Sequence, residues 1–116
     1  MKMHGYAREG FDMSGQRSIE ALIEELDATQ DDEARAPILL ELLRQPGHER
    51  HEDIVFELGL IGLPDAVEAI ATSAASPFPY IEEWGNLHEF QRKCAYALAR
   101  IGTERSREAL EQMAGN

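Results

Sequence analysis

The 116 residues carry 22 acidic and 11 basic side chains, which gives a formal net charge of −11 at pH 7. Such a field repels nucleic acid and anionic lipid, and it attracts basic proteins. The single cysteine, Cys94, excludes an internal disulfide, and no apolar run approaches the length of a membrane span. The sequence therefore predicts a cytoplasmic protein that binds neither nucleic acid nor membranes.

The negative charge is concentrated in one part of the chain. Residues 18–90 contain 17 acidic and three basic side chains, a local net charge of −14. Residues 91–107 reverse this balance with five basic side chains and one acidic one, Glu104. Two interpretations stay open: the acidic region is a surface for a basic partner, or it serves solubility alone.

The N-terminal part of the domain predicts two helices. Residues 1–15 show no sustained period and are expected to form a flexible arm, which leaves residues 16–116 as a single domain. Ser18 can cap a first helix, and Asp31 or Asp32 a second one, which Pro46-Gly47 ends. Pro37 predicts either a kink in the second helix or a start delayed to about that residue. The expected buried residues are Ile19, Leu22, Ile23, Leu26, Ile38, Leu39, Leu40, Leu42 and Leu43.

Four more helices are expected in the rest of the chain. The third runs from about Glu49 to Ile61 with Gly62 as its stop, and Pro64 suits the first turn of the fourth. Asn86 and Glu89 form a capping-box-like start for the fifth helix. Gly102-Thr103 ends the fifth helix and caps the sixth. The expected inward residues of these helices are Ile54, Val55, Leu58, Ile61, Val67, Ile70, Ala74, Leu87, Phe90, Cys94, Ala97, Leu98, Ile101, Ala109, Leu110 and Met113.

The last four helices contain an internal repeat. Residues 50–74 align without a gap on residues 90–114, at an offset of 40. Both copies show an apolar helical run that ends in Ile-Gly, one linker residue and a second amphipathic helix. A helix pair repeated in tandem cannot bury its apolar faces alone, so it stacks on its neighbour. The sequence therefore predicts an all-α fold of three helical hairpins.

The repeated pattern resembles the HEAT-like repeat of the bilin-lyase type. The resemblance is carried by Leu58, Ile61-Gly62, Pro64-Asp65 and Ala69-Ile70, and again by Leu98, Ile101-Gly102 and Ala109-Leu110. It covers residues 50–75 and 87–114, and residues 18–45 only as a generic helix pair. The resemblance implies a right-handed α-solenoid of three stacked hairpins, whose second helices line a concave binding face.

The repeat is longer than about 30 residues, the usual period of such hairpins, and residues 76–86 hold the excess. This connection contains Phe78, Tyr80 and Trp84, the only tryptophan, beside Glu82 and Glu83. Long loops often carry binding function, and Trp and Tyr dominate interface hot spots. The sequence leaves two interpretations open with equal weight: these aromatics bind a partner, or Phe78 and Trp84 fill the gap between stacked hairpins.

The sequence offers no convincing catalytic or metal-binding motif. His48 and His51 are three residues apart, whereas a zincin helix needs a spacing of four, so exposed charge at a helix start is the better interpretation. Cys94 lies on the inward face of its helix and is expected to be a buried thiol. No phosphate-binding loop, nucleophile elbow or Cys/His cluster is present. We expect no catalytic residue, no metal and no cofactor.

These observations favour a non-catalytic protein-binding module. Residues 84–98 are similar to small bacterial HEAT-like proteins found beside toxin genes, which implies an immunity protein that neutralises a basic toxin. Such a protein would be a monomer when free. The alternatives are a cofactor-handling factor like the bilin lyases, which the acidic balance disfavours because the tetrapyrrole is anionic, and a generic scaffold subunit. The candidate partner-binding residues are Glu20, Glu24, Asp65, Glu68, Phe78, Tyr80, Glu82, Glu83 and Trp84.

Overall fold

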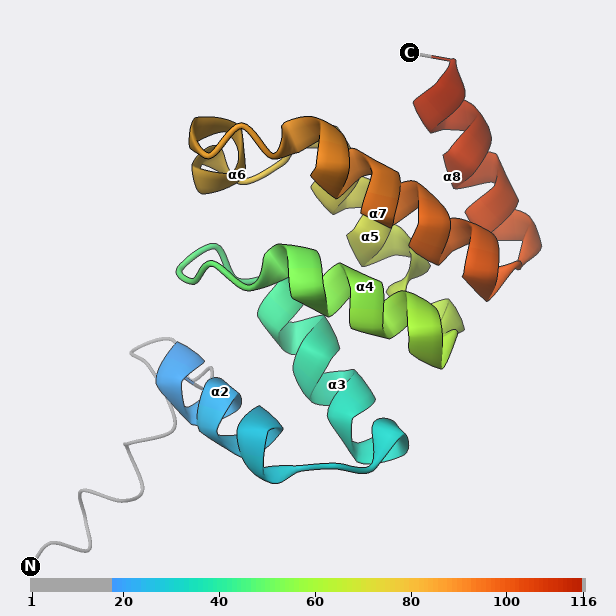
Figure 1. Cartoon of the computed structure of the whole chain (residues 1–116). Coiled ribbons are helices and arrows are strands. Elements are labelled where there is room, and N and C mark those ends of the chain that lie inside the picture. Colours follow the sequence, from blue (N-terminus) through green and yellow to red (C-terminus); the bar gives the residue numbers. More distant parts are fainter. Residues whose placement is uncertain (1–17, 116) are drawn as a thin grey trace, which may run out of the picture.

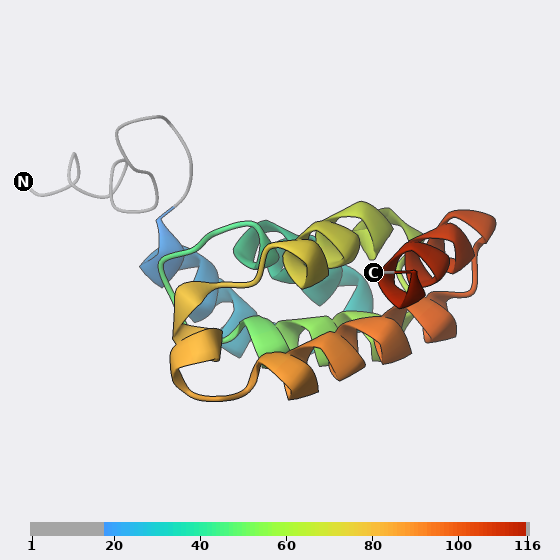
Figure 2. The ribbon, with the colours of Figure 1, turned by 90° about the horizontal axis from the view of Figure 1, so that it is seen from above.

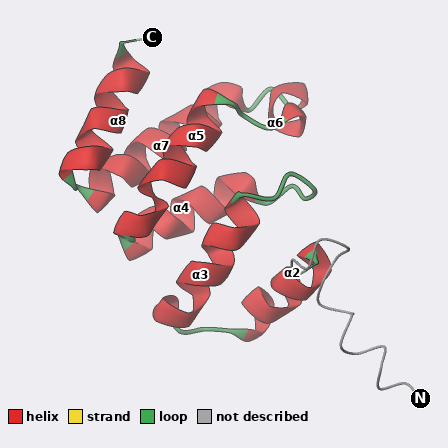
Figure 3. Cartoon of the chain, turned by 180° about the vertical axis from the view of Figure 1, so that it is seen from behind, coloured by secondary structure: helices red, strands yellow, loops and turns green. Residues whose placement is uncertain are grey.

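A computed structural model describes residues 18–115 of the chain. These residues form seven α-helices and one short 3₁₀ helix, and no strand occurs among them (Figures 1 and 3). The predicted arm, residues 1–15, lies outside the described part. The elements in chain order are α2 (Ile19–Ala28), α3 (Asp32–Leu43), α4 (His51–Ile61), η1 (Pro64–Ala66), α5 (Val67–Ala75), α6 (Pro79–Glu83), α7 (Leu87–Ile101) and α8 (Glu104–Ala114).

Side-chain and glycine caps set most of the helix boundaries. The side chains of Ser18, Asp31 and Thr103 accept hydrogen bonds from backbone N–H groups in the first turns of α2, α3 and α8. Gly62 and Gly102 end α4 and α7 in the left-handed conformation, with φ of 77° and 71°. Because this conformation strains residues that carry a Cβ, glycine is the natural residue at both ends.

One local expectation is wrong, and two others become more definite. Helix α3 begins at Asp32 and continues through Pro37, so of the two alternatives for Pro37 the delayed start does not occur. Helix α4 begins at His51, close to the expected start at about Glu49. Asn86 makes no capping hydrogen bond through its side chain, because its backbone (φ −103°, ψ 11°) is outside the extended conformation that a cap requires.

The helices form three stacked hairpins, α2/α3, α4/α5 and α7/α8, with α6 added between the second and third. The most extensive pairing is between α4 and α7, which lie side by side in both views (Figures 1 and 2). Helix α7 also packs against α5 and α8, and α3 packs against α4 and α5. The fold is therefore the HEAT-like solenoid of helical hairpins that the repeat predicted.

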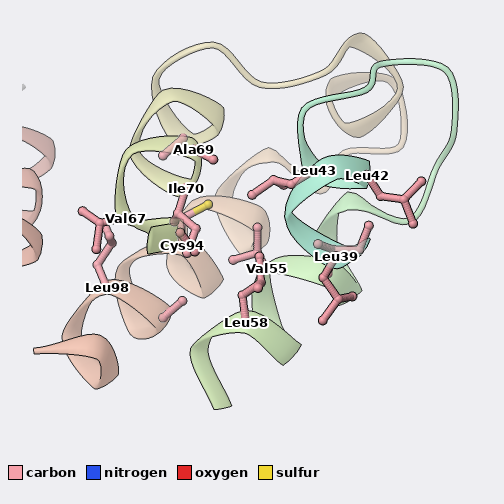
Figure 4. Close-up of a cluster of buried hydrophobic side chains, with 14 of the residues drawn as sticks. Leu39, Leu42, Leu43, Val55, Leu58, Val67, Ala69, Ile70, Cys94 and Leu98 are labelled. Atoms are coloured by element: carbon pink, nitrogen blue, oxygen red, sulfur yellow. The ribbon is translucent and has the colours of Figure 1, made fainter. Parts of the chain in front are cut away.

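One hydrophobic core runs through all three hairpins. Leu58 and Leu98 are fully buried, as expected, whereas Ile61 and Ile101 are only partly buried because they lie in the last turns of their helices. Cys94 is also fully buried, as its position on α7 predicted. Figure 4 shows the cluster, in which Leu39, Leu42 and Leu43 from α3 lie with Val55 and Leu58 from α4, Val67, Ala69 and Ile70 from α5, and Cys94 and Leu98 from α7.

Arg35 links the first hairpin to the second. Its guanidinium group donates to both carboxylate oxygens of Glu57 on α4, at 2.6 and 3.0 Å. The same group donates to the carbonyl oxygens of Leu26 and Thr29 at the end of α2, at 2.8 and 2.7 Å. The hydrogen bond to Glu57 raises the pKa of Arg35. One side chain of α3 thus satisfies the C-terminal end of α2 and connects it to α4.

Candidate functional site

The insertion between the second and third hairpins is partly helical. Its residues Pro79–Glu83 form α6, with Pro79 in the first turn, where a missing N–H costs nothing. Ile81 is 1% exposed and anchors α6 to the core. Gly85 follows in the left-handed conformation, with φ of 76°, and directs the chain into α7. The insertion is therefore a fixed element of the fold.

His51 holds this insertion in place. Its imidazole is fully buried, which contradicts the expectation of exposed charge at this position. Nε2 lies 2.6 Å from the carbonyl oxygen of Gln45, and Nδ1 lies 2.8 Å from the hydroxyl oxygen of Tyr80. Because a carbonyl can only accept, Nε2 carries the proton and Nδ1 accepts from Tyr80. The Tyr80 hydroxyl in turn accepts from the backbone N–H of His51 at 3.1 Å.

Two rings stack on His51. Its ring centroid lies 4.0 Å from that of His48 and 3.6 Å from that of Phe78, with nearly parallel planes. Burial lowers the pKa of His51 to about 4 and also lowers the pKa of His48. Both imidazoles are therefore neutral at pH 7, and the stack contains no repulsion between charges. Phe78 belongs to this packing, so the gap-filling interpretation fits Phe78.

Trp84 differs from Phe78, because 55% of it is exposed to solvent. Its ring meets that of Tyr80 edge-on, with 5.0 Å between centroids and 74° between planes. The carboxylates of Glu82 and Glu83 are exposed on the same short helix. Trp84 is therefore a surface aromatic in a fixed position, and the gap-filling interpretation is wrong for it.

An open cleft of about 530 Å³ lies beside Tyr80. One wall is the loop before α4 and the other is α6. Glu49 belongs to the first wall, and Tyr80 and Glu83 belong to the second. Burial raises the pKa of Tyr80, so its hydroxyl stays protonated at neutral pH. The cleft is lined by Pro46, Gly47, His48, Glu49, Pro79, Tyr80 and Glu83.

The other candidate residues lie on different elements. Glu20 and Glu24 are exposed on α2, the first helix of the described chain. Glu68 on α5 forms a two-pronged ion pair with Arg105 on α8, at 2.5 and 3.0 Å, so its charge is balanced within the chain. Asp65 is exposed and lines a second cleft of about 420 Å³, whose lining is Asp32, Glu33, Ala36, Pro37, Leu40, Ile61, Leu63 and Asp65.

The fold thus brings together Phe78, Tyr80, Glu83 and Trp84 around α6. Glu68 lines a further cleft of about 350 Å³ together with Phe78. Glu20 and Glu24 on α2 and Asp65 on η1 lie on other elements. Sequence reasoning missed Glu49, which lines the cleft, and His51, which anchors it. Neither residue has a local signal, since Glu49 lies in a loop of charged residues and His51 differs from His48 only by what covers it. Both could be found only from the position of α6.

Burial raises the pKa of the Cys94 thiol to about 12, which leaves it protonated at neutral pH. No group of three or more His, Cys, Asp or Glu side chains in residues 18–115 is placed to hold a metal ion. No helix among the described residues is both long enough and apolar enough to span a membrane.

The family model of the PBS lyase HEAT-like repeat matches residues 90–116. Neither the curated proteins nor the solved structures contain a match to the chain. The matched residues correspond to α7 and α8, the hairpin that repeats α4 and α5 at an offset of 40. The third hairpin is therefore similar to one HEAT-like repeat, and the chain is a helical-repeat protein of a kind that commonly mediates protein binding.

Proposed function

We propose that this chain is a non-catalytic module that binds a basic protein through α6 and the acidic surface around it. The observation that carries the proposal is Trp84, a half-exposed indole held in place by Tyr80 and His51 and flanked by Glu82 and Glu83. A rigid aromatic side chain loses little entropy when it is covered, and Trp and Tyr are enriched among interface hot spots.

The cleft beside Tyr80 suits a lysine or arginine side chain of the partner. Its aromatic wall can pack against the aliphatic stem of such a side chain, and the carboxylates of Glu49 and Glu83 can pair with the charged end. A carboxylate ligand would instead meet charges of its own sign. The chemistry of the cleft therefore favours a cationic group.

Long-range charge supports the same kind of partner. Residues 18–90 carry a net charge of −14, and most of their carboxylates are exposed. A field of this sign accelerates the approach of a basic protein and slows that of nucleic acid. Glu20 and Glu24 on α2, together with Asp65 in its own cleft, contribute to the field without belonging to the α6 site.

The specific form that we propose is an immunity protein for a basic toxin domain. The acidic field, the rigid aromatic anchor and the helical-repeat architecture suit tight capture of a nucleic-acid-acting toxin. A bilin-lyase-like role would need a pocket for an anionic tetrapyrrole, and the carboxylates of Glu49 and Glu83 disfavour one at the α6 cleft. A scaffold subunit remains the alternative, distinguished by a partner that is not basic.

Affinity capture from the native cells with quantitative mass spectrometry tests the proposal. We expect the wild-type chain to retain a basic protein that a Trp84→Ala, Glu83→Ala bait loses, with affinity lower by a factor of about 30 or more. Glu111→Ala is the control, because Glu111 is an exposed carboxylate on α8, at the other end of the molecule from α6 (Figure 1).

The association rate with the purified partner should fall steeply as salt rises, and Glu20→Lys with Glu24→Lys should lower it further. An acidic partner, or equal capture by the wild-type and Trp84→Ala baits, would show that α6 is not the binding site.

A further inference from the structure

The outward face of α4 and α7 carries a second exposed apolar patch. Among the described residues, four large apolar side chains are exposed, and three of them lie on this face: Phe56 (42%), Leu60 (49%) and Tyr96 (49%). The rings of Phe56 and Tyr96 are 6.5 Å apart and nearly parallel. A contiguous patch of this kind on a small protein indicates an interaction site.

The rings of this patch are held by interactions within the chain. The Lys93 ammonium lies 5.8 Å from the centroid of the Phe56 ring and pairs with Glu52 at 2.9 Å. The Arg100 guanidinium lies 5.9 Å from the Tyr96 ring, and its Nε donates to the carbonyl oxygen of Gly59 at 3.2 Å. The patch is therefore ordered before any partner arrives.

The internal repeat makes the two helices of this face equivalent in position but opposite in charge. At the offset of 40, Phe56 corresponds to Tyr96. Glu52 corresponds to Arg92, and Asp53 to Lys93. Helix α4 is thus the acidic side of the face and α7 is the basic side, with an aromatic ring on each.

We propose that this face binds the same face of a second copy of the chain. Helices α4 and α7 lie side by side and run in the same direction (Figures 1 and 2). A two-fold axis parallel to them lays α4 of one copy over α7 of the other, so that corresponding turns of the two helices meet. Phe56 then faces Tyr96 of the second copy. Asp53 faces the turn of α7 in the second copy that contains Arg92.

Charge selects this arrangement over the alternatives. A two-fold axis across the helices would place α4 on α4 and α7 on α7, so that the acidic side would meet the acidic side and the basic side the basic side. The parallel axis forms each acid–base contact twice, as an isologous interface requires. This dimer departs from the monomer expected from the sequence. It leaves Trp84 and α6 outside its centre, so it is independent of the proposed capture of a basic protein.

The outermost charges provide a sharp test. Asp53 is exposed, and the side chain of Arg92 is 66% exposed with only a 3.4 Å contact to Glu89 of its own helix. Asp53→Lys and Arg92→Glu should therefore fold normally, yet each places like charges at both contacts of the dimer. Mixing the two variants, or combining both changes in one chain, restores opposite charges at both contacts.

Sedimentation velocity of about 1 to 500 µM protein measures the dimerisation. The salt concentration is 0.15 M, at which the Debye length is about 8 Å, so the repulsion between the two negatively charged copies is largely screened. We expect the wild type to approach twice 13.0 kDa within this range. Each single reversal should weaken dimerisation at least tenfold, and the mixture and the double variant should recover it. Circular dichroism establishes that every variant is folded.

Glu24→Lys on α2 is the matched control, because it changes the net charge as much as Asp53→Lys does and lies away from this face. It should leave the dimer unchanged or strengthen it slightly. A wild type that stays at 13.0 kDa throughout would overturn the proposal. The proposal would also be overturned if the double variant dimerised no more strongly than Asp53→Lys or Arg92→Glu alone.

Discussion

Gly59 on α4 lies directly against Ala97 on α7. A Cβ placed on Gly59 would be 2.7 Å from both the Cα and the Cβ of Ala97, closer than such atoms approach one another. Gly59 is buried in the interior of a helix, where glycine is otherwise unfavourable. The missing side chain therefore allows the closest approach of the two helices that form the most extensive pairing of the fold.

Gly59→Ala should destabilise the protein even though alanine is the better helix former. The substitution gains about 1 kcal/mol of helix propensity, but overpacking against backbone atoms of Ala97 costs about 1–3 kcal/mol. We expect a net loss of about 1 kcal/mol in urea unfolding. Gln112→Ala, at an exposed position of α8, is the control and should change the free energy of unfolding little. An unchanged or raised midpoint for Gly59→Ala would mean that α4 and α7 are farther apart.

The buried His51 predicts a loss of stability in mild acid. Its pKa is lowered from 6.5 to about 4, so the folded protein keeps it neutral while the unfolded chain protonates it first. Its contribution is therefore complete above pH 6.5 and declines as the pH falls from about 6.5 to about 4. The loss from this group should reach roughly 2–3 kcal/mol at pH 4.

Denaturant unfolding at a series of pH values measures this dependence. His51→Asn cannot titrate in this range, so its curve should be flatter than that of the wild type between pH 6.5 and 4, although it is less stable at pH 7. His48 also contributes, because burial lowers its pKa too, and His48→Asn should remove a smaller part of the slope. Parallel curves for the wild type and His51→Asn would contradict a neutral buried imidazole.

Substitutions at Tyr80 and Trp84 should have opposite effects: the first should lower the stability of the fold, and the second should weaken binding of the partner. Tyr80→Phe removes the hydroxyl that bonds to the backbone N–H and to Nδ1 of His51, which should cost about 1–3 kcal/mol of folding free energy. Trp84→Ala removes an exposed ring and should change stability by no more than about 0.5 kcal/mol while it weakens capture of the basic partner. Thermal unfolding and binding measured on both variants decide this. A large loss of stability for Trp84→Ala would place the indole in the core.

Arg35→Ala should loosen the first hairpin. It removes the ion pair to Glu57 and leaves the carbonyl oxygens of Leu26 and Thr29 without that donor, so we expect a loss of about 2 kcal/mol. Arg35→Lys should recover only part of this, because an ammonium group cannot bond as a planar fork. Arg44→Ala, at the exposed C-cap of the same helix, is the control. Amide hydrogen exchange should be faster in α2 of Arg35→Ala than in α2 of the wild type, with little change in α8. If the substitution accelerated exchange in α8 as much as in α2, the linking role would be contradicted.

The hairpins and the core were predictable because their signals are local. Each helix shows its own apolar period, its own cap or glycine end, and a repeat partner 40 residues away, so Leu58, Leu98 and Cys94 could be placed inside from the sequence. The error at Asn86 concerns a local signal of the same kind. There the backbone conformation, and not the residue type, decided that the side chain makes no capping hydrogen bond.

The site depended on which segments meet in space. His48 and His51 look alike in the sequence, yet α6 and Phe78 cover His51 completely. Phe78 and Trp84 are equally aromatic, yet one ring stacks on His51 and the other faces solvent. Burial of a single side chain is a property of its three-dimensional neighbours, and here those neighbours are about 30 residues away. The sequence by itself determined a helical-repeat fold with strong negative charge, and only the tertiary structure decided which aromatic and acidic side chains a partner can reach.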